Sequence, residues 1–278
     1  MGSIFPSNPL VISDDGNFIA LGSPHYVNGG GGVHTFTRSN NTWSFQQYIP
    51  FPDSGYFGNG MAYAEDTETL MVGGPRCDEN NTNTGTIFFY HKNGSGTWTL
   101  DTQIDGQDYG DYFGGWCTIS KDGMTAAWGP KDDVTSSNAN RTISNEAVHV
   151  YTNDGTANGG VWTLQQRFSS SNYSESDNEK FAQTVELSDD GNTMLVAAYD
   201  KHVTIDGTAY TDIGQAYIFT RSGNTWTELG VINIPTSYVD DSREFGHYGR
   251  LSPDGEYVYL YSRGNSSRHG TVHIYEKG

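Results

Sequence analysis

One pattern recurs five times along this 278-residue chain, and it constrains the fold more than any other feature. Each copy opens with a short apolar segment and a tight turn, and four of the five turns contain an Asp-Gly pair. That pair supplies the positive φ angles that a tight hairpin requires. The five openings are PLVISDDGN (9–17), MAYAEDTE (61–68), WCTISKDG (116–123), TVELSDDGN (184–192) and GRLSPDGE (249–256). Such a repeat predicts an array of similar supersecondary units.

Three further strands are expected after the turn in each copy. The second strand is almost wholly apolar, as in MLVAAY (194–199) and YVYLYS (257–262), which is typical of a strand buried on both faces. The third alternates His or aromatic residues with Val, Ile or Ala, as in VHVYTN (148–153), so both of its faces are expected to pack. The fourth carries a tryptophan in four copies: Trp43, Trp98, Trp162 and Trp226. Four antiparallel strands repeated around an axis are typical of β-propeller blades.

We therefore predict an all-β fold, a five-bladed β-propeller of four-stranded antiparallel blades that forms a single domain over residues 1–278. The blades are expected at about 1–50, 51–106, 107–170, 171–238 and 239–278. The last copy ends at VHIYEKG (272–278), directly after its third strand, and too few residues precede the first copy to supply another strand. The last blade is thus predicted to lack its outer strand, and the ring to close without it.

Each copy also begins with an aromatic dipeptide, and a Gly-x-Pro run follows the second strand in the early copies. The dipeptides are Phe57-Gly58, Phe113-Gly114, Phe181-Ala182 and Phe245-Gly246, with Phe5-Pro6 as a degenerate first copy, and the runs include LGSP (21–24) and VGGP (72–75). These motifs cover essentially the whole chain and resemble the FG-GAP repeat in its bacterial extracellular form. The resemblance implies an extracellular or cell-surface propeller related in architecture to the integrin α-subunit head. It implies no particular ligand.

Integrin-type repeats often carry a calcium loop of the pattern Asp-x-Asp-x-Asp-Gly, and no such run exists here. We interpret SDDGN at 13–17 and 188–192 as hairpin turns. Acidic residues nevertheless gather on loops of one expected face, so we considered calcium there, with scattered acids exposed to solvent as the alternative. The candidate ligands are Asp105, Asp108, Asp111, Asp132, Asp133, Asp240 and Asp241. Other acids expected on that face are Asp78, Glu79, Glu175, Asp177, Glu179, Asp200 and Asp206.

The overall charge excludes one class of partner. The chain has 33 acidic and 15 basic residues, a formal net charge of −18, which repels the phosphate backbone of a nucleic acid. No apolar run is long enough to span a bilayer, so no membrane span is expected. The N-terminal MGSIFPSNPL lacks the charged-then-apolar pattern of a signal peptide.

Aromatic residues on the same loops are candidates for stacking on sugar rings, or alternatively for plugging the junctions between blades. They are Tyr26, Tyr56, Tyr109, Tyr112, Tyr173, Tyr199 and Tyr238. Catalysis needs a constellation of groups, and no local motif marks one, so the chain is predicted not to be an enzyme. His25 and His202 are interpreted as surface residues, because they lack partners at metal-ligand spacing.

Two kinds of covalent modification are considered. Cys77 and Cys117 are expected at the same end of adjacent blades, where they would form either a disulfide or two buried free thiols. Six Asn-x-Ser/Thr sequons, little more than chance gives in this composition, are candidate glycosylation sites. They begin at Asn40, Asn80, Asn93, Asn140, Asn172 and Asn265.

The missing outer strand suggests how the protein works. It leaves the third strand of the last copy as a free edge with Val272, Ile274 and Tyr275, which invites pairing with another chain. The alternative is a short edge guarded by Glu276 and Lys277. We therefore predict a non-enzymatic structural or adhesive surface module that self-associates, with a filament as one form, or binds a surface protein or glycan. A carbohydrate-binding propeller is the second hypothesis, and a glycan-acting enzyme the third.

Overall fold

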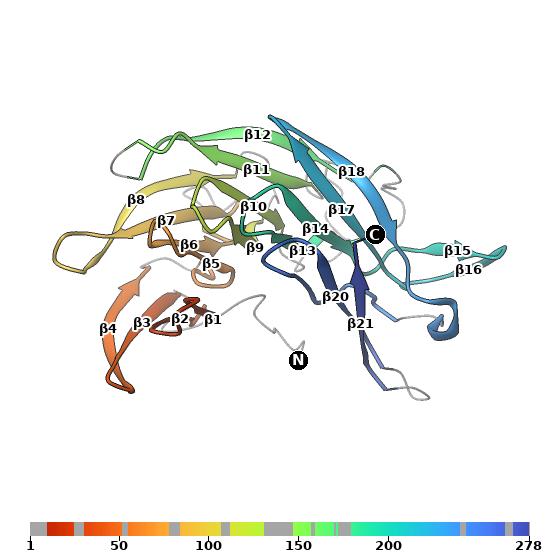
Figure 1. Ribbon diagram of the computed structural model, residues 1–278, viewed down its shortest axis with the longest axis horizontal. Helices are drawn as coiled ribbons and strands as arrows, with labels where there is room; N and C mark the ends of the chain where they lie inside the picture. The colour runs from red at the N-terminus through yellow and green to blue at the C-terminus, as the bar shows by residue number, and fades with distance from the viewer. Residues whose placement is uncertain are drawn as a thin grey trace.

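The computed structural model confirms the all-β prediction. It describes residues 10–24, 31–51, 55–77, 84–106, 112–130, 147–156, 159–169, 171, 179–239, 243–264 and 269–277. Five antiparallel sheets stand around a common axis as the blades of a propeller (Figure 1). Within those ranges the one helical element is a 3₁₀ turn, η3 (Thr236–Tyr238).

Each sheet follows the strand order predicted from the repeat, and four of the five sheets have four strands. Blade 1 contains β1 (Leu10–Ile12), β2 (Phe18–Gly22), β3 (Gly32–Ser39) and β4 (Thr42–Pro50). Blade 2 contains β5 (Met61–Ala64), β6 (Thr69–Gly74), β7 (Thr86–Lys92) and β8 (Trp98–Asp105). Blade 3 contains β9 (Phe113–Ile119), β10 (Thr125–Pro130), β11 (Val148–Asn153) and β12 (Trp162–Phe168).

The last two blades depart from this plan. Blade 4 contains β13 (Phe181–Leu187), β14 (Thr193–Ala198), β17 (Gln215–Ser222) and β18 (Thr225–Ile232). A two-stranded ribbon of β15 (Val203–Ile205) and β16 (Thr208–Tyr210) lies between β14 and β17 in the chain. Among the described residues, blade 5 has three strands, β19 (Gly249–Leu251), β20 (Tyr257–Ser262) and β21 (Thr271–Glu276), and lacks the outer strand, as predicted.

The Asp-Gly turns are hairpins held by one repeated hydrogen-bond pattern. In blade 1, the Ser13 hydroxyl donates to Asp15 Oδ1 at 2.6 Å, and the Asn17 N–H donates to the same oxygen at 2.8 Å. Gly16 follows with φ of +66°, which glycine adopts without strain. The same Ser-to-Asp bond recurs in the hairpins of blades 3, 4 and 5. The interpretation of SDDGN as a turn is therefore confirmed.

Backbone hydrogen bonds link these hairpins around the axis and then stop. The Asp66 N–H donates to the Lys121 carbonyl at 3.0 Å, and the Lys121 N–H to the Asp189 carbonyl at 3.0 Å. The Asp189 N–H donates in turn to the Pro253 carbonyl at 2.8 Å. Proline has no backbone N–H, so Pro253 cannot donate the corresponding hydrogen bond to a carbonyl of blade 1.

The hydrophobic core consists of clusters between neighbouring blades. Four such clusters join blades 1 and 2, 2 and 3, 3 and 4, and 4 and 5. Every residue of β6, β10 and β14 is buried, which confirms the prediction that these strands pack on both faces.

The repeated glycines have a packing role at these seams. A Cβ at Gly22, Gly73 or Gly129 would lie within 2.0, 2.2 and 1.9 Å of a carbonyl oxygen in the next blade. Those carbonyls belong to Gly58, Gly114 and Ala182, the second residues of the Phe-Gly-type pairs, whose phenylalanines are buried. Two blades can therefore approach this closely only where the earlier blade has glycine.

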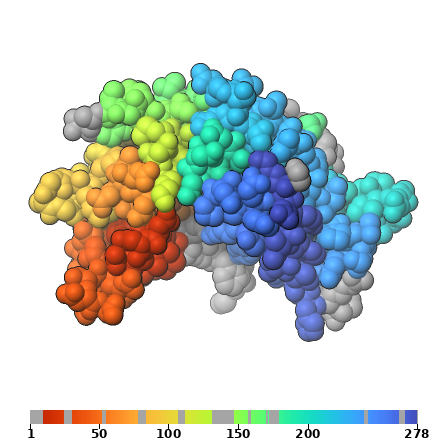
Figure 2. Space-filling model, in the orientation of Figure 1, coloured from red at the N-terminus to blue at the C-terminus, as the bar shows by residue number. Residues whose placement is uncertain are grey.

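The prediction that the ring closes is wrong for the described residues. The blades form an arc (Figures 1 and 2), with an opening between the ribbons of blade 1 and blade 5 (Figure 1), and none of the four hydrophobic clusters joins blade 1 to blade 5. The physical reason is the absence of a partner for each terminal blade: the axial hydrogen bonds end at Pro253, and both facing sheets keep apolar side chains exposed to solvent.

Candidate functional site at the open seam

The opening is bounded by one face of blade 1, which we call the blade 1 wall (Leu10, Ile12, Ile19, Leu21, His34 and Phe36). Leu10 and Ile12 are 51% and 55% exposed. Their counterparts in blade 4, Val185 and Leu187, are 1% and 8% exposed because blade 3 covers them. The blade 1 wall therefore has the composition of a blade–blade contact but lacks the second blade.

The opposite side of the opening is the blade 5 wall (Tyr257, Tyr259, Tyr261, Val272 and Ile274), and the two walls together form the open seam. Val272 and Ile274 are 62% and 64% exposed. Ala216, the counterpart of Val272 in blade 4, is completely buried against blade 5. Positions that are buried at the intact seams are thus exposed on both sides of this one.

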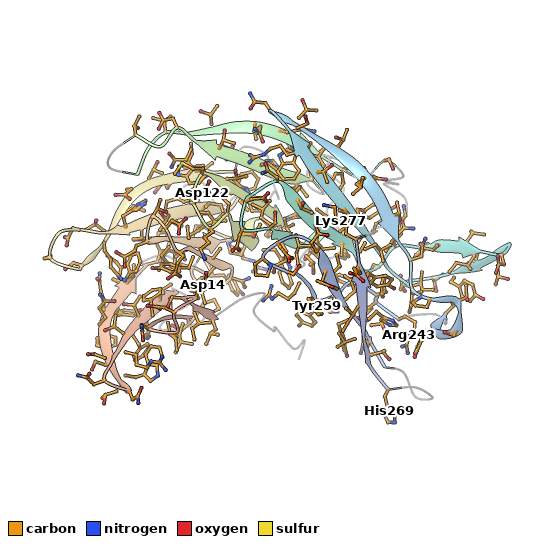
Figure 3. The ribbon with its side chains drawn as sticks, viewed as in Figure 1. Asp14, Asp122, Arg243, Tyr259, His269 and Lys277 are labelled. Carbon is orange, nitrogen blue, oxygen red and sulfur yellow. The ribbon has the colours of Figure 1, made fainter. Side chains whose placement is uncertain are left out.

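Three tyrosines on β20 distinguish the blade 5 wall from every other blade. They occupy the positions of Thr193, Leu195 and Ala197 in blade 4, and Tyr261 also corresponds to the close-contact glycines Gly22, Gly73 and Gly129. Tyr259 lies on the side of β20 that faces the opening (Figure 3). A large ring fits at position 261 because no next blade approaches it.

An aromatic cleft of about 220 Å³ lies at the inner end of this wall, lined by Trp116, Tyr248, Gly249, Arg250, Tyr259, Tyr261 and Val272. The Tyr248 ring lies 6.1 Å from the rings of both Trp116 and Tyr261. Tyr248 also stacks on His247 at 4.8 Å, and His247 on Tyr199 at 4.3 Å. Because Tyr199 is buried, this stack fixes Tyr248 to the core.

Charged groups of both signs border the open seam. On blade 5, Arg250 pairs with Glu186, and the Tyr257 hydroxyl donates to Glu276 at 3.1 Å. On blade 1, Arg38 lies over the Trp43 ring at 5.7 Å.

The arginine of blade 1 has a counterpart that shows what such a residue does at an intact seam. Arg221 of blade 4 lies over Trp226 at 5.5 Å, and its Nη1 donates across the seam to Thr125 Oγ1 of blade 3 at 2.9 Å. The repeat places Tyr257 of blade 5 where Thr125 stands in blade 3.

A second cavity, of about 500 Å³, lies elsewhere, between the β15–β16 ribbon and the body of blade 4. Its lining includes Lys201, Gln215 and Asn233. The Lys201 ammonium pairs with the buried Glu179 carboxylate, so the one lysine of this cavity is already neutralised.

The predicted calcium ligands remain a prediction. Asp105 ends β8 and accepts a hydrogen bond from Thr86 Oγ1 at 2.8 Å, whereas Asp108, Asp111, Asp132, Asp133, Asp240 and Asp241 lie outside the described residues. In the part of the chain that the structure describes, no three His, Cys, Asp or Glu side chains are grouped to hold a metal.

Of the tyrosines predicted to bind sugar, Tyr112 and Tyr199 are buried, and Tyr199 stacks on His247 at the junction of blades 4 and 5, as the alternative expected. Tyr56 lies under the Arg76 guanidinium at 4.8 Å, and Tyr238 contacts His273 edge-on at 5.0 Å. Tyr26, Tyr109 and Tyr173 lie outside the described residues. The sequence interpretation missed the exposed tyrosines of β20, although tyrosine in place of Gly, Ala or Thr was the available signal.

Of the two alternatives for the cysteines, the structure has the second: Cys77 and Cys117 are both buried, and no disulfide joins them. The physical reason is that they lie in different clusters, Cys77 between blades 1 and 2 and Cys117 between blades 2 and 3. Burial raises the pKa of the Cys117 thiol far above its usual range, so this cysteine is kept as a neutral apolar group.

The predicted glycosylation sites and surface histidines lie on exposed turns or outside the described residues. Asn40 lies in the β3–β4 turn, and Asn93 Oδ1 accepts hydrogen bonds from the Ser95 and Thr97 N–H groups, both at 3.0 Å. Asn80, Asn140, Asn172, Asn265 and His25 lie outside the described residues. His202 is on the surface and contacts Asp212.

Comparison with known proteins supports the fold alone. Among solved structures, the chain is similar to hydrazine synthase of Kuenenia stuttgartiensis with a TM-score of 0.56 at 13% identity, over 97% of this chain and 71% of that one. Neither a protein-family model nor a curated protein sequence matches the chain, so the FG-GAP resemblance is not confirmed. Among the described residues, no helix is long and apolar enough to cross a membrane.

Proposed function

We propose that this chain is a non-catalytic structural or adhesive module of an extracellular or cell-surface assembly, and that it associates with a second copy of itself through the open seam. One observation supports this proposal above the others. The residues of the blade 1 and blade 5 walls match positions that are mostly buried at the four intact seams, yet here they are half-buried or exposed. Contiguous apolar surface of this kind is typical of protein–protein interfaces.

A second copy supplies what each wall lacks. Each blade has one face toward the preceding blade and one toward the following blade, and at all four clusters these two kinds of face pack on each other. The blade 5 wall is a face of the second kind and the blade 1 wall a face of the first kind. The blade 5 wall of one molecule therefore fits the blade 1 wall of another. This contact uses two different surfaces and is therefore head-to-tail. Because the arc already wraps most of the way around its axis, an added copy must be displaced along that axis, which gives a filament (Figure 1).

The charges at the walls favour the same arrangement. The net charge of −18 opposes association in general, but the blade 1 wall is bordered by Arg38 and the blade 5 wall by Glu276. By analogy with Arg221 and Thr125, Arg38 of one copy would reach the Tyr257–Glu276 pair of another. Added salt screens the general repulsion between copies, so we expect association to increase between low and moderate ionic strength.

A mixing experiment tests the proposal. Leu21→Asp places a charge in the blade 1 wall, and Ile274→Asp places one in the blade 5 wall. Each variant alone lacks one of the two contact surfaces, so we expect it to sediment as a monomer. An equimolar mixture keeps one intact pair of walls and is expected to form dimers that grow no further. Leu164→Asp, on the exposed outer strand of blade 3, is the control and should assemble like the unaltered chain. Monomers in the mixture, or a monomeric unaltered chain at all concentrations, would overturn the proposal.

A further inference from the structure

The aromatic cleft of the blade 5 wall offers ring faces that are held in place before any ligand arrives. The face of Tyr248 is fixed by its stack on His247 and Tyr199, and Trp116 is buried in β9 with its ring 6.1 Å from that of Tyr248. Rigid aromatic surfaces bind with little loss of conformational entropy. A flat and partly apolar group is the shape that such a cleft receives.

Polar groups stand beside these rings. Arg250 lines the cleft and is held by Glu186, so a guanidinium and a carboxylate lie together at its border. Tyr248, Tyr259 and Tyr261 add hydroxyl groups that donate and accept hydrogen bonds. The cleft thus combines apolar faces with hydrogen-bonding groups of both kinds.

The tyrosines continue beyond the cleft as a row. Tyr261, Tyr259 and Tyr257 alternate along β20 on the same face, and residues two apart on a strand are about 6.6 Å apart. Tyr257 and Tyr259 are both exposed. This spacing presents successive rings along a line, which suits a chain of repeating flat units better than one isolated small molecule.

From these features we infer that the cleft and the tyrosine row bind a neutral oligosaccharide, whose pyranose rings stack on the tyrosines while their hydroxyls reach Arg250 and Glu186. Pyranose rings have an apolar C–H face and a polar rim, which matches the two kinds of groups present. The acidic charge of the chain disfavours anionic sugars. This inference goes beyond the proposed self-association and does not depend on it.

The two activities share a surface, which gives a testable link between them. Tyr259 and Val272 line the cleft and also belong to the wall that a second copy would cover. A bound oligosaccharide and a docked copy therefore exclude each other on blade 5. Saturating sugar is expected to weaken association in proportion to its own binding, because linkage is reciprocal.

The test is titration calorimetry of the full chain against hexasaccharides of β-linked glucose, xylose, mannose and N-acetylglucosamine. At least one is expected to bind saturably at up to 10 mM, with Tyr248→Ala and Tyr259→Ala each weakening it by about tenfold or more. Trp43→Ala, at 39% exposure against 38% for Tyr259 but outside the cleft, should bind normally. Circular dichroism confirms that each variant folds.

Three results would overturn the inference. They are no saturable binding of any hexasaccharide by the unaltered chain, binding that survives both cleft substitutions, and binding only of a proline- and aromatic-rich peptide offered in parallel, which would make the cleft a peptide site. An unaltered chain that self-associates but binds none of the hexasaccharides would refute this inference alone. Sugar binding by a chain that stays monomeric would refute only the proposed self-association.

Discussion

Truncating Ile274 should weaken association by an amount that the structure sets. The side chain is 64% exposed in the single molecule, and a second copy would cover it. Burying a whole Ile side chain contributes about 1.5–3 kcal/mol, so completing the burial of two-thirds of it contributes about 1–2 kcal/mol. Ile274→Ala loses most of this free energy of association, so the dissociation constant of each contact should increase about five- to thirtyfold.

Ile274→Asp should have a larger effect for a second reason. It loses the same apolar burial and also places a carboxylate in a contact that excludes water, on a chain that already carries a charge of −18. We expect at least a hundredfold loss, about 3 kcal/mol or more. Sedimentation velocity over a concentration series gives both dissociation constants.

The matched control for this series is Leu164, which is 47% exposed on β12 of blade 3. Figure 1 shows β12 on the side of the arc away from the opening. Leu164→Ala and Leu164→Asp should leave the dissociation constant within about twofold of the unaltered value. Equal effects at positions 274 and 164 would show that general surface hydrophobicity, and not the open seam, drives association. A smaller effect of Asp than of Ala at position 274 would also refute the reasoning.

Three further predictions concern the fold. Gly73→Ala places a Cβ 2.2 Å from the Gly114 carbonyl oxygen and should cost about 3 kcal/mol or more in urea unfolding, whereas Gly230→Ala, with no atom within 4 Å, should be neutral or slightly stabilising; equal stabilities would refute the close-packing account. Burial lowers the pKa of His149 to about 3 from 6.5, so the unfolded chain binds the proton more readily, and stability should fall by up to about 1.4 kcal/mol per pH unit as the pH drops from 6.5 toward 3. His149→Phe should flatten this profile, and an unchanged slope would contradict the assignment. Cys77 and Cys117 should react with a thiol reagent only after denaturation, without prior reduction, and a requirement for a reductant would mean that they are paired.

Much of the fold could be predicted from the repeat because each copy contains short sequence motifs that determine its own turns and strands. The Ser-x-Asp-Gly turns, the apolar second strands and the missing outer strand of blade 5 were all predicted from short sequence segments. These features depend on neighbouring residues and on alternation along a strand, which a single sequence displays.

The candidate site was predicted less well because it depends on a missing contact, the packing of blade 1 on blade 5, and these blades are far apart in the sequence. The segment YVYLYS at 257–262 looks like any other buried second strand, and its exposure follows only from the empty place beside blade 5. Similarly, Cys77 and Cys117 are near in the repeat, but the clusters that bury them are separated by blade 2. The free edge of β21 was predicted from sequence, but the exposed face that Val272 and Ile274 share with Tyr259 and Tyr261 was not.

A crystal structure of the chain tests the central claim, the open seam, most directly. Our account predicts that Leu10 and Ile12 of blade 1 do not touch Val272 and Ile274 of blade 5 within one molecule, and that each wall faces solvent or the opposite wall of a second copy. Direct packing of blade 1 on blade 5 within one chain, with these four side chains buried against each other, would contradict it.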